Sequence, residues 1–519
     1  MTRTRLALPV LAAVAALAIA GCGGGGESSS DLAGFAAPGS LVFVEGKLRP
    51  SGELKSNVDS LAGKVAGVDS LGELVVEKLE ESAREDGEPV DFATEVEPWL
   101  GEDGALSFKT VDAENDPTEL VMAIATTDPA ATQEFVAKQA EGGKRPYEEG
   151  SYKGVEFEVG GSEDQAVGVV DDFLVVAESE SVFKAAVDAW QGESLADEAR
   201  FQDAISAASD GSLADVYLDL GALAKASDGE FEEQASQFFQ SAGVDLDEAT
   251  AVASVIPKSD RVEVAVSSEL SGTEPPPSGD ASELIGTLPG DSFAAIGFAE
   301  FDERLKKRLN EVDKEGIPGQ VPPNQLKSTL QAMGIDLDQL ASSLEEGALF
   351  ARGKSRDGLE GALVLTSDSS EAAKTVANLG VLLRNTGTPG VTAVTSNGAS
   401  GFSIRSDELG EKPLVVVAKG ERVAVGYGLP PALDGLASEG ETLSEKASYK
   451  AAVAALGDTP ISGFADGPAA LGLAEALVSR SKEGFWEAVP YLKKIEFVAI
   501  GSGSDGDVAT VRLIAGLKE

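Results

Sequence analysis

Two short patterns in the 519-residue sequence have a spacing that could carry chemistry. Residues 501–506 read Gly-Ser-Gly-Ser-Asp-Gly, which matches a dinucleotide-binding loop, where a strand, a turn and a helix direct N–H groups at a pyrophosphate. The residues on both sides read as strands, so we expect a hairpin loop and no nucleotide. The Ser-x-x-Lys spacing of a nucleophile motif occurs at 181–184 and at 479–482, without the partner motifs that normally accompany it. We expect Lys184 to lie on a solvated helix face.

The sequence contains no histidine, which excludes Ser-His-Asp and Cys-His catalysis and histidine-ligated metals. Its 88 acidic residues produce carboxylate pairs by chance, so a carboxylate-based hydrolase is the weakest hypothesis. Asp-x-Asp pairs at 245–247 and 505–507 could bind calcium, but no EF-hand loop surrounds them. The pairs at 245–247 and 336–338 are more typical of helix starts. We therefore predict no catalytic residue, no cofactor and no metal ligand, and a protein that is not an enzyme.

Cys22 is the only cysteine, and its position is informative. It follows an uncharged apolar run over residues 6–21, which is long enough for a signal peptide but shorter than the ~20 residues of a membrane-spanning helix. The three residues before it, Ile-Ala-Gly, resemble the bacterial lipobox, in which the chain is cut before the cysteine and the thiol is diacylated. We expect a lipoprotein signal peptide over residues 1–21, cleavage between Gly21 and Cys22, and lipidation of Cys22. Two acyl chains suffice for stable anchoring.

Residues 22–30 are rich in Gly and Ser and are expected to form a flexible tether. The folded part would then lie at the extracytoplasmic face of the bacterial cell membrane. A net charge of −47 disfavours nucleic-acid binding and direct attraction to anionic lipid. The acidic surface is expected to be solvated, and an apolar content of 42% indicates a globular chain.

Five segments recur in the same order, about 240–250 residues apart, which indicates a tandem duplication of a domain of about 240 residues. The segments begin at Pro38, Val90, Glu119, Ser194 and Ala253 in the first copy, and at Pro289, Ile335, Gly361, Thr442 and Ala499 in the second. We place the first repeat at 31–270 and the second at 284–519. The Pro/Ser/Gly-rich residues 271–283 are expected to form a linker.

Within each copy, alternating apolar segments and tight turns predict consecutive β-hairpins, with turns at Asp171–Asp172 and Lys419–Gly420. Regular strand–helix–strand alternation is missing. The fold class is therefore predicted as α+β, with a mainly antiparallel sheet and packed helices in each repeat. The large aromatic residues Trp99, Trp190 and Trp486 are expected in the core, with a ligand pocket as the alternative.

Residues 97–108 read EPWLGEDGALSF, and with the lipobox and PGSLVFVEGKL from Pro38 they are similar to a family of bacterial, chiefly actinobacterial, lipoproteins grouped as a domain of unknown function, DUF3352. The second copy lacks the Pro-Trp pair. The resemblance spans the mature chain and implies a location but no reaction.

Three functions are considered. The leading hypothesis is a lipid-anchored cell-envelope protein with a non-enzymatic binding or structural role, whose partners are the membrane, through the acyl chains on Cys22, and other envelope proteins. The alternative is a carrier or sensor of a lipid or other apolar ligand, which a continuous apolar cavity of several hundred Å³ would favour. The carboxylate-based hydrolase is the second alternative.

Overall fold

The structure is a computed structural model of the whole chain. It describes residues 29–86, 90–112, 116–142, 147–160, 165–226, 246–269, 280–316, 322–332, 335–367, 371–385, 387–406, 410–436, 440–480, 482–505 and 508–518. The chain divides into two compact units, one reaching to Pro276 and including Ser504–Val511, the other comprising Pro277–Gly503 and Arg512–Lys518. Most of the predicted linker, 271–283, lies outside the described residues, so the linker stays a prediction.

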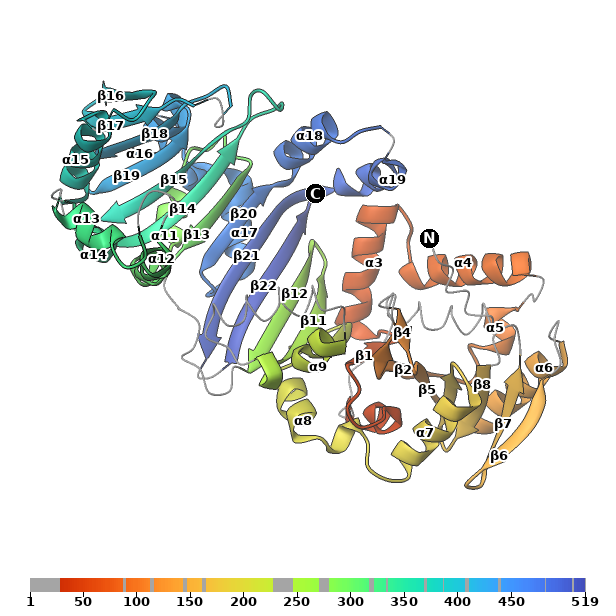
Figure 1. Cartoon of the computed structure of the whole chain (residues 1–519). Helices are drawn as coiled ribbons and strands as arrows, with labels where there is room; N and C mark the ends of the chain where they lie inside the picture. Colours follow the sequence, from red (N-terminus) through yellow and green to blue (C-terminus); the bar gives the residue numbers. More distant parts are fainter. Residues whose placement is uncertain are drawn as a thin grey trace. The chain divides into compact units, whose positions relative to one another are not determined.

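The first unit contains one large antiparallel sheet (Figure 1). Its strands are β1 (Val42–Lys47), β2 (Leu100–Phe108), β5 (Val121–Thr126), β6 (Glu148–Tyr152), β7 (Val155–Gly160), β8 (Gln165–Val170), β9 (Phe173–Ala177), β10 (Ala214–Asp219), β11 (Thr250–Lys258) and β12 (Arg261–Glu269). Backbone pairing gives the order β6-β7-β8-β9-β5-β2-β1-β10-β11-β12. A two-residue pair, β3 (Thr110–Val111) with β4 (Pro117–Thr118), stands apart from this sheet.

Both faces of this sheet are apolar, because buried strands alternate their side chains with period two. On β5, Val121 and Ala123 join one core cluster, and Met122 and Ile124 join the other. The first cluster is covered by α2 (Ser29–Leu32), η1 (Ala33–Phe35), α7 (Glu180–Trp190), η2 (Leu195–Asp197) and α8 (Ala199–Ser206). The second is covered by α4 (Leu71–Asp86) and α6 (Pro129–Gly142). In the chain, α3 (Gly52–Ala66) precedes α4, and the short α5 (Phe92–Glu95) lies between α4 and α6. Two short helices, α9 (Leu220–Ala226) and η3 (Leu246–Glu248), lie between β10 and β11 in the chain.

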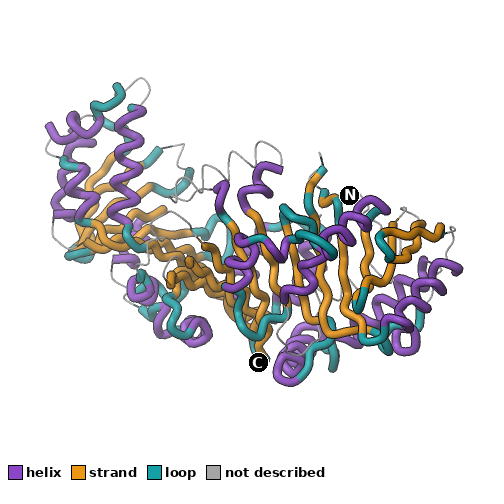
Figure 2. The backbone as a smooth tube through the Cα atoms, turned by 90° about the horizontal axis from the view of Figure 1, so that it is seen from below, coloured by secondary structure: helices purple, strands orange, loops and turns teal. Residues whose placement is uncertain are grey.

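The second unit repeats this arrangement (Figure 2 distinguishes its strands from the helices). Its strands are β13 (Ala294–Phe298), β14 (Leu344–Arg352), β15 (Glu360–Ser367), β16 (Val391–Ser396), β17 (Ala399–Ile404), β18 (Leu414–Lys419), β19 (Arg422–Tyr427), β20 (Ile461–Asp466), β21 (Ile495–Asp505) and β22 (Val508–Leu517). The pairing order is β16-β17-β18-β19-β15-β14-β13-β20-β21, so each of these strands has a counterpart in the first unit.

The helices of the second unit follow the same order along the chain. They are α11 (Ser282–Gly286), α12 (Phe301–Glu315), α13 (Leu326–Ala332), α14 (Leu337–Ser342), α15 (Glu371–Asn385), α16 (Leu429–Leu436), η5 (Leu443–Glu445), α17 (Ala447–Leu456), α18 (Gly467–Leu477) and α19 (Glu483–Leu492). The predicted α+β class with a large antiparallel sheet is thus confirmed.

Details of several predicted turns can now be compared with the structure. The turn at Asp171–Asp172 joins β8 to β9 as predicted. The turn between β18 and β19 lies one residue later than predicted, at Gly420–Glu421, because Lys419 still pairs with Arg422. The prediction of a loop over the whole of residues 501–506 is wrong, because the strand β21 continues to Asp505.

An edge-to-face aromatic pair recurs in both units. Phe201 of α8 packs against Tyr217 of β10, with ring centroids 5.1 Å apart and planes at 73°. In the second unit Tyr449 of α17 packs against Phe464 of β20, at 5.2 Å and again 73°. The phenol and phenyl rings have exchanged places, while the contact geometry, which aromatic quadrupoles favour, is the same.

Trp99, the aromatic residue of the EPWLGEDGALSF segment, lies in the second core cluster of the first unit with 2% of its surface exposed. Its ring packs at 5.4 Å from Phe135 of α6, and its Nε1–H donates a hydrogen bond to the Glu95 carbonyl over 2.7 Å. The core role predicted for Trp99 is confirmed.

Replacing Trp99 with alanine is expected to lower the free energy of unfolding by about 3–5 kcal/mol, because the change leaves a large cavity between α6 and the sheet. Urea denaturation followed by circular dichroism measures the effect. Trp99→Phe, which keeps most of the apolar volume, is the matched control and should cost less. Equal stability of Trp99→Ala and the unchanged chain would contradict the core assignment.

Candidate functional site

Glu45 is a carboxyl group placed inside the first unit. It lies in the middle of β1, between β2 and β10, and has 8% of its surface exposed. Its Oε2 has no hydrogen-bond partner among the described atoms. A buried polar atom without a partner lowers the free energy of unfolding. We therefore expect this residue to have a role other than stabilising the fold.

Charged side chains surround Glu45 on the neighbouring strands, and we call Glu45, Lys47, Asp103 and Asp215 the Glu45 cluster. Glu45 lies directly opposite Asp215 of β10, and Lys47 lies opposite Asp103 of β2. Lys47 Nζ is 2.8 Å from Asp103 Oδ1, so the cation of the cluster is paired with Asp103. The cluster therefore holds three acidic groups and one cation.

Asp215 is satisfied by hydroxyl groups. It accepts hydrogen bonds from the Oγ atoms of Ser212 and Ser254, each over 2.6 Å. Ser254 is 1% exposed and also accepts a hydrogen bond from the Ser209 backbone N–H over 2.9 Å. Asp215 and Asp103 thus have partners, whereas the described atoms provide no hydrogen-bond donor to Glu45 Oε2.

Burial is the main reason why the pKa of Glu45 is raised from 4.5 to about 8. The negative charge of Asp103 raises this pKa further, Lys47 lowers it, and Asp215 and Asp31 add smaller increases. A carboxyl group with this pKa carries a proton at neutral pH, whereas most carboxyl groups have lost theirs. The cluster can therefore take up or release one proton near physiological pH.

The N-terminal segment, defined here as Ser29–Phe35 (α2 and η1), covers the face of the sheet to which Glu45 points. Phe43, two residues before Glu45 on β1, and Ala105, opposite Glu45 on β2, belong to the same core cluster as Leu32 and Phe35. Phe35 stacks in parallel on Trp190, with ring centroids 4.4 Å apart. The N-terminal segment thus contributes to the burial of Glu45, which keeps 8% of its surface exposed.

The second unit has no carboxyl group at the equivalent place. Alignment of the two sequences from Pro38 and Pro289 equates Glu45 with Ile296. Strand pairing shows that the equivalent residue lies one position later in the second unit. Val44 pairs with Leu106, as Ile296 pairs with Leu349, so the counterpart of Glu45 is Gly297.

Gly297 is needed because a bulky residue covers it. A Cβ atom at Gly297 would lie 2.8 Å from Ile285 Cδ1. Ile285 is the counterpart of Ala33, because the next equivalent residues, Ala36 and Leu288, both accept a 2.9 Å hydrogen bond from the start of the following 3₁₀ helix. The first unit therefore combines a small covering residue with Glu45, and the second combines a large covering residue with glycine.

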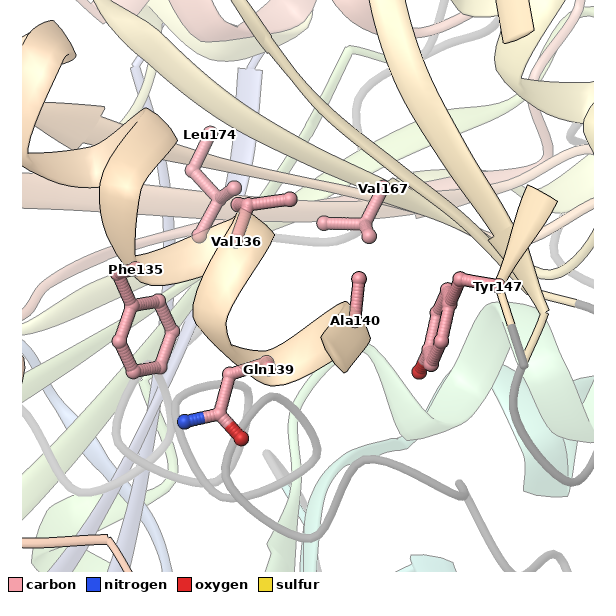
Figure 3. A pocket seen from close by; sticks show the side chains of 7 residues that line it. All are labelled: Phe135, Val136, Gln139, Ala140, Tyr147, Val167 and Leu174. Carbon is pink, nitrogen blue, oxygen red and sulfur yellow. The ribbon is translucent and has the colours of Figure 1, made fainter. Parts of the chain in front are cut away.

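An apolar pocket lies between α6 and the sheet of the first unit (Figure 3). It is lined by Phe135, Val136, Gln139, Ala140, Tyr147, Val167 and Leu174. Its volume of about 10 Å³ is close to the minimum that holds one water molecule. The interface between this helix and the sheet is thus nearly filled by side chains.

Three further clefts are larger but open to solvent, and one of them, of about 260 Å³, lies beside α16 in the second unit. The remaining two are larger still. One, of about 430 Å³, lies in the first unit beside Trp190 and is lined largely by Gln, Glu and Asp side chains and by strand residues. Trp190 Nε1 donates a 2.7 Å hydrogen bond to Asp171 at its edge. The other, of about 490 Å³, lies in the second unit between α11 and α17, beside Tyr449. Of the three tryptophans, Trp190 is therefore the one that lines a described cleft.

The Ser-x-x-Lys pattern at residues 181–184 is not assembled into a nucleophile site. Lys184 Nζ pairs with Glu180 Oε1 over 2.6 Å on α7, and both side chains are substantially exposed, as expected. Ser181 Oγ faces Ser179 Oγ at 3.0 Å rather than the lysine. Residues 501–505 lie in β21, which is not followed by a helix but by β22, so the dinucleotide pattern lacks its structural context.

The remaining predicted positions divide between helix starts and undescribed residues. Asp336 caps α14 by accepting a 2.9 Å hydrogen bond from the Gln339 N–H, as predicted. Cys22 and Gly21, and the carboxylates Asp245 and Asp507, lie outside the described residues. Within the described ranges, no group of three or more Asp, Glu or Cys residues is placed to hold a metal ion, and no helix is long and apolar enough to span a membrane.

Sequence reasoning missed Glu45, although one signal was available. In the strand segment Leu41–Lys47 the odd-numbered positions read Leu, Phe, Glu and Lys. The period-two rule places Glu45 on the same face as Phe43, which is a core position.

The high pKa of Glu45 predicts a decrease in stability with rising pH. Between about pH 4.5 and pH 8 the folded chain keeps this proton and the unfolded chain loses it, so unfolding is favoured as the pH rises through this window. The loss is expected to reach at most roughly 4 kcal/mol. Glu45→Gln should remove this contribution and be more stable than the unchanged chain at pH 8. Urea denaturation of both proteins at pH 5, 6.5 and 8 measures the difference, and a difference that does not change with pH would contradict the assignment.

One family model matches the chain, that of a protein of unknown function, DUF3352, over residues 75–400. No curated protein matches the chain. Among solved structures, crystal form III of TP0453 has a TM-score of 0.24 at 9% identity, covering 47% of this chain and 81% of its own. Crystal form I of the same protein has a TM-score of 0.24 at 10% identity, covering 48% and 82%. Similarity at this level carries no argument about fold or function. Because the matched residues 75–400 make up more than half of the 519 residues, the chain belongs to the DUF3352 family of proteins of unknown function.

Proposed function

We propose that the protein is a lipid-anchored component of the bacterial cell envelope, held at the extracytoplasmic face of the membrane, with a non-enzymatic binding or structural role. The observation that carries this proposal is the short distance between the anchor and the fold. Helix α2 begins at Ser29, so only residues 23–28 separate Cys22 from the first described element. Fully extended, these residues reach roughly 25 Å. An acylated Cys22 would therefore hold the first unit close to the lipid surface.

The first described residues after the tether are part of the core of the first unit, which supports a structural or binding role. Leu32, Ala33 and Phe35 are each at most 3% exposed. A tether that enters the fold through buried residues keeps the first unit, rather than a loose tail, near the membrane. The open cleft beside Trp190 then presents polar side chains to other envelope components.

The alternative, a carrier of a lipid or other apolar ligand, needs an apolar cavity. Pockets for drug-sized ligands measure roughly 300–1,000 Å³. The apolar pocket beside α6 measures about 10 Å³, and the cleft beside Trp190 is lined largely by polar side chains. The clefts of about 260 and 490 Å³ in the second unit are open to solvent and do not enclose an apolar cavity. The binding or structural role is therefore preferred over the carrier role.

We also propose that the two units arose by duplication of one domain. The shared strand order supports this, and so do similar contacts of the aspartate that ends β10 in the first unit and β20 in the second. Asp219 and Asp466 each accept a 2.9 Å hydrogen bond from a backbone N–H of the following helix. Each carboxylate is also paired with a cation, Arg200 at 3.1 Å and Lys446 at 2.9 Å. The two cations come from different positions, so the shared strand order and the shared capping hydrogen bond are the features that favour duplication.

Lipidation predicts a specific covalent change at Cys22. The mature protein should lack residues 1–21 and carry the mass of the acyl chains on Cys22, as measured by intact-mass and peptide mass spectrometry of the membrane fraction. Cys22→Ser should abolish the added mass. A matched control, Cys22→Ser with Ser28→Cys, keeps one cysteine in the tether but moves it away from the cleavage site, and it should also stay unmodified. An unmodified Cys22 in the mature, unchanged protein would overturn the proposal.

The preferred role also predicts an empty interior. Native mass spectrometry of the whole protein, extracted from bacterial envelopes in mild detergent, should give the mass of the acylated chain without a further molecule. Solvent extraction of the same sample should release no stoichiometric lipid. A lipid bound at one copy per chain or per unit would reject the preferred role in favour of the carrier.

A further inference from the structure

We infer that Glu45 and the N-terminal segment form a proton-dependent latch, in which Ser29–Phe35 stays docked on the sheet while the Glu45 carboxyl group is protonated and is released when that group ionises. This inference goes beyond the proposed envelope role, and the latch itself does not require lipidation of Cys22.

The described surroundings of Glu45 provide neither a hydrogen-bond donor to Oε2 nor an unpaired cation that would stabilise the ionised carboxylate. Four charged groups act on Glu45: Asp103 from β2, Lys47 from β1 itself, Asp215 from β10 and Asp31 from α2. Lys47, the one cation of this set, is already paired with Asp103 at 2.8 Å. Glu45 Oε2 has no hydrogen-bond partner among the described atoms. A negative charge there must gain contact with water.

Of the elements around Glu45, the N-terminal segment is the one that can detach with the least loss of backbone pairing. Strand β1 is held by backbone pairing on both sides, to β2 and to β10. Helix α2 has four residues, which is far below the length at which an isolated helix is stable. The segment is held mainly by burial of Leu32, Ala33 and Phe35 and by the stacking of Phe35 on Trp190. Its release also moves the like charge of Asp31 away from Glu45.

The second unit provides an internal comparison. The equivalent cover, α11, places Ile285 against Gly297, which has no side chain to ionise. Burial and the charges of Asp280 and Glu283 raise the pKa of Glu346 on β14, but this side chain is only partly buried. Both Leu284 and Ile285 are at most 2% exposed. The latch is therefore a property of the first unit, which is the unit that follows Cys22.

Release would change the reach of the protein from its anchor. With Cys22 acylated as proposed, the docked state leaves residues 23–28 as the tether, and the released state extends the tether to Leu41, the residue before β1. The extended length of the tether then increases roughly threefold. The proton on Glu45 would thus control how far the folded part stands from the membrane.

Hydrogen–deuterium exchange of the whole protein in detergent tests the latch directly. Protection factors, which correct for the intrinsic pH dependence of exchange, are measured for peptides covering residues 29–41 at pH 5, 6, 7 and 8. We expect protection in this segment to fall at least tenfold between pH 5 and pH 8, because release is coupled to loss of one proton. Peptides from β5 and β11 should stay more strongly protected than residues 29–41 at every pH, because their opening requires global unfolding.

Three variants sharpen the experiment. Glu45→Gln should make the protection of residues 29–41 independent of pH. The double variant Ala33→Ile with Glu45→Gly introduces the residue types of Ile285 and Gly297 of the second unit. It should also make the protection of residues 29–41 independent of pH, and the added isoleucine should fill the space left by Glu45. Glu263→Gln is the matched control, because Glu263 is also a buried carboxylate, 3% exposed, but is paired with Arg261 at 2.7 Å. It should behave like the unchanged chain.

Three outcomes would overturn the latch. Protection of residues 29–41 could be constant across this pH range in the unchanged chain, it could fall equally in both Glu45 variants, or it could equal that of β5 and β11 at every pH. The last result would indicate global unfolding. None of these measurements depends on acylation, so failure of the latch and failure of the proposed anchor can be distinguished.

Discussion

The alternation of side chains along buried strands is the constraint on which this structure depends. Because Val121 and Ala123 point to one face of β5 while Met122 and Ile124 point to the other, the sheet of the first unit has two apolar faces. Each face must be covered to remove that surface from water. The chain supplies α4 and α6 for one face and the N-terminal segment with α7 and α8 for the other. The first residues after the tether are therefore structural residues, and Glu45 becomes buried because the segment Ser29–Phe35 is needed as a cover.

Much of this architecture could be predicted from the sequence because it depends on local signals. The hairpin at Asp171–Asp172 and the helix capped by Asp336 follow from turn and capping chemistry within a few residues. What could not be predicted depends on partners far apart in the chain. The neighbours of β1, namely β2 and β10, are separated from it by long insertions, and the environment of Glu45 exists only once all three strands are paired.

The correction of one residue between Glu45 and Gly297 illustrates the same limit. Aligning Pro38 with Pro289 is reasonable for two similar Pro-Gly turns, but the second unit has one more residue between this turn and its strand. Hydrogen-bonded register, rather than sequence similarity, decides which residues are equivalent. The candidate site was missed for this reason: the sequence alignment set Glu45 against the apolar Ile296 and gave no reason to examine the residue that covers it.

The exchange of Ala33 and Glu45 in one unit for Ile285 and Gly297 in the other has a consequence for folding. Two sheets with the same strand order in one chain offer each covering segment two similar places to dock, which is a known route to misassembly in repeated proteins. Ile285 has no room over Glu45, and Ala33 over Gly297 would leave a void. The mismatched arrangements are therefore penalised by both volume and charge. Each covering segment therefore fits the sheet of its own unit better than the sheet of the other unit. This difference favours correct docking of both segments as the chain folds.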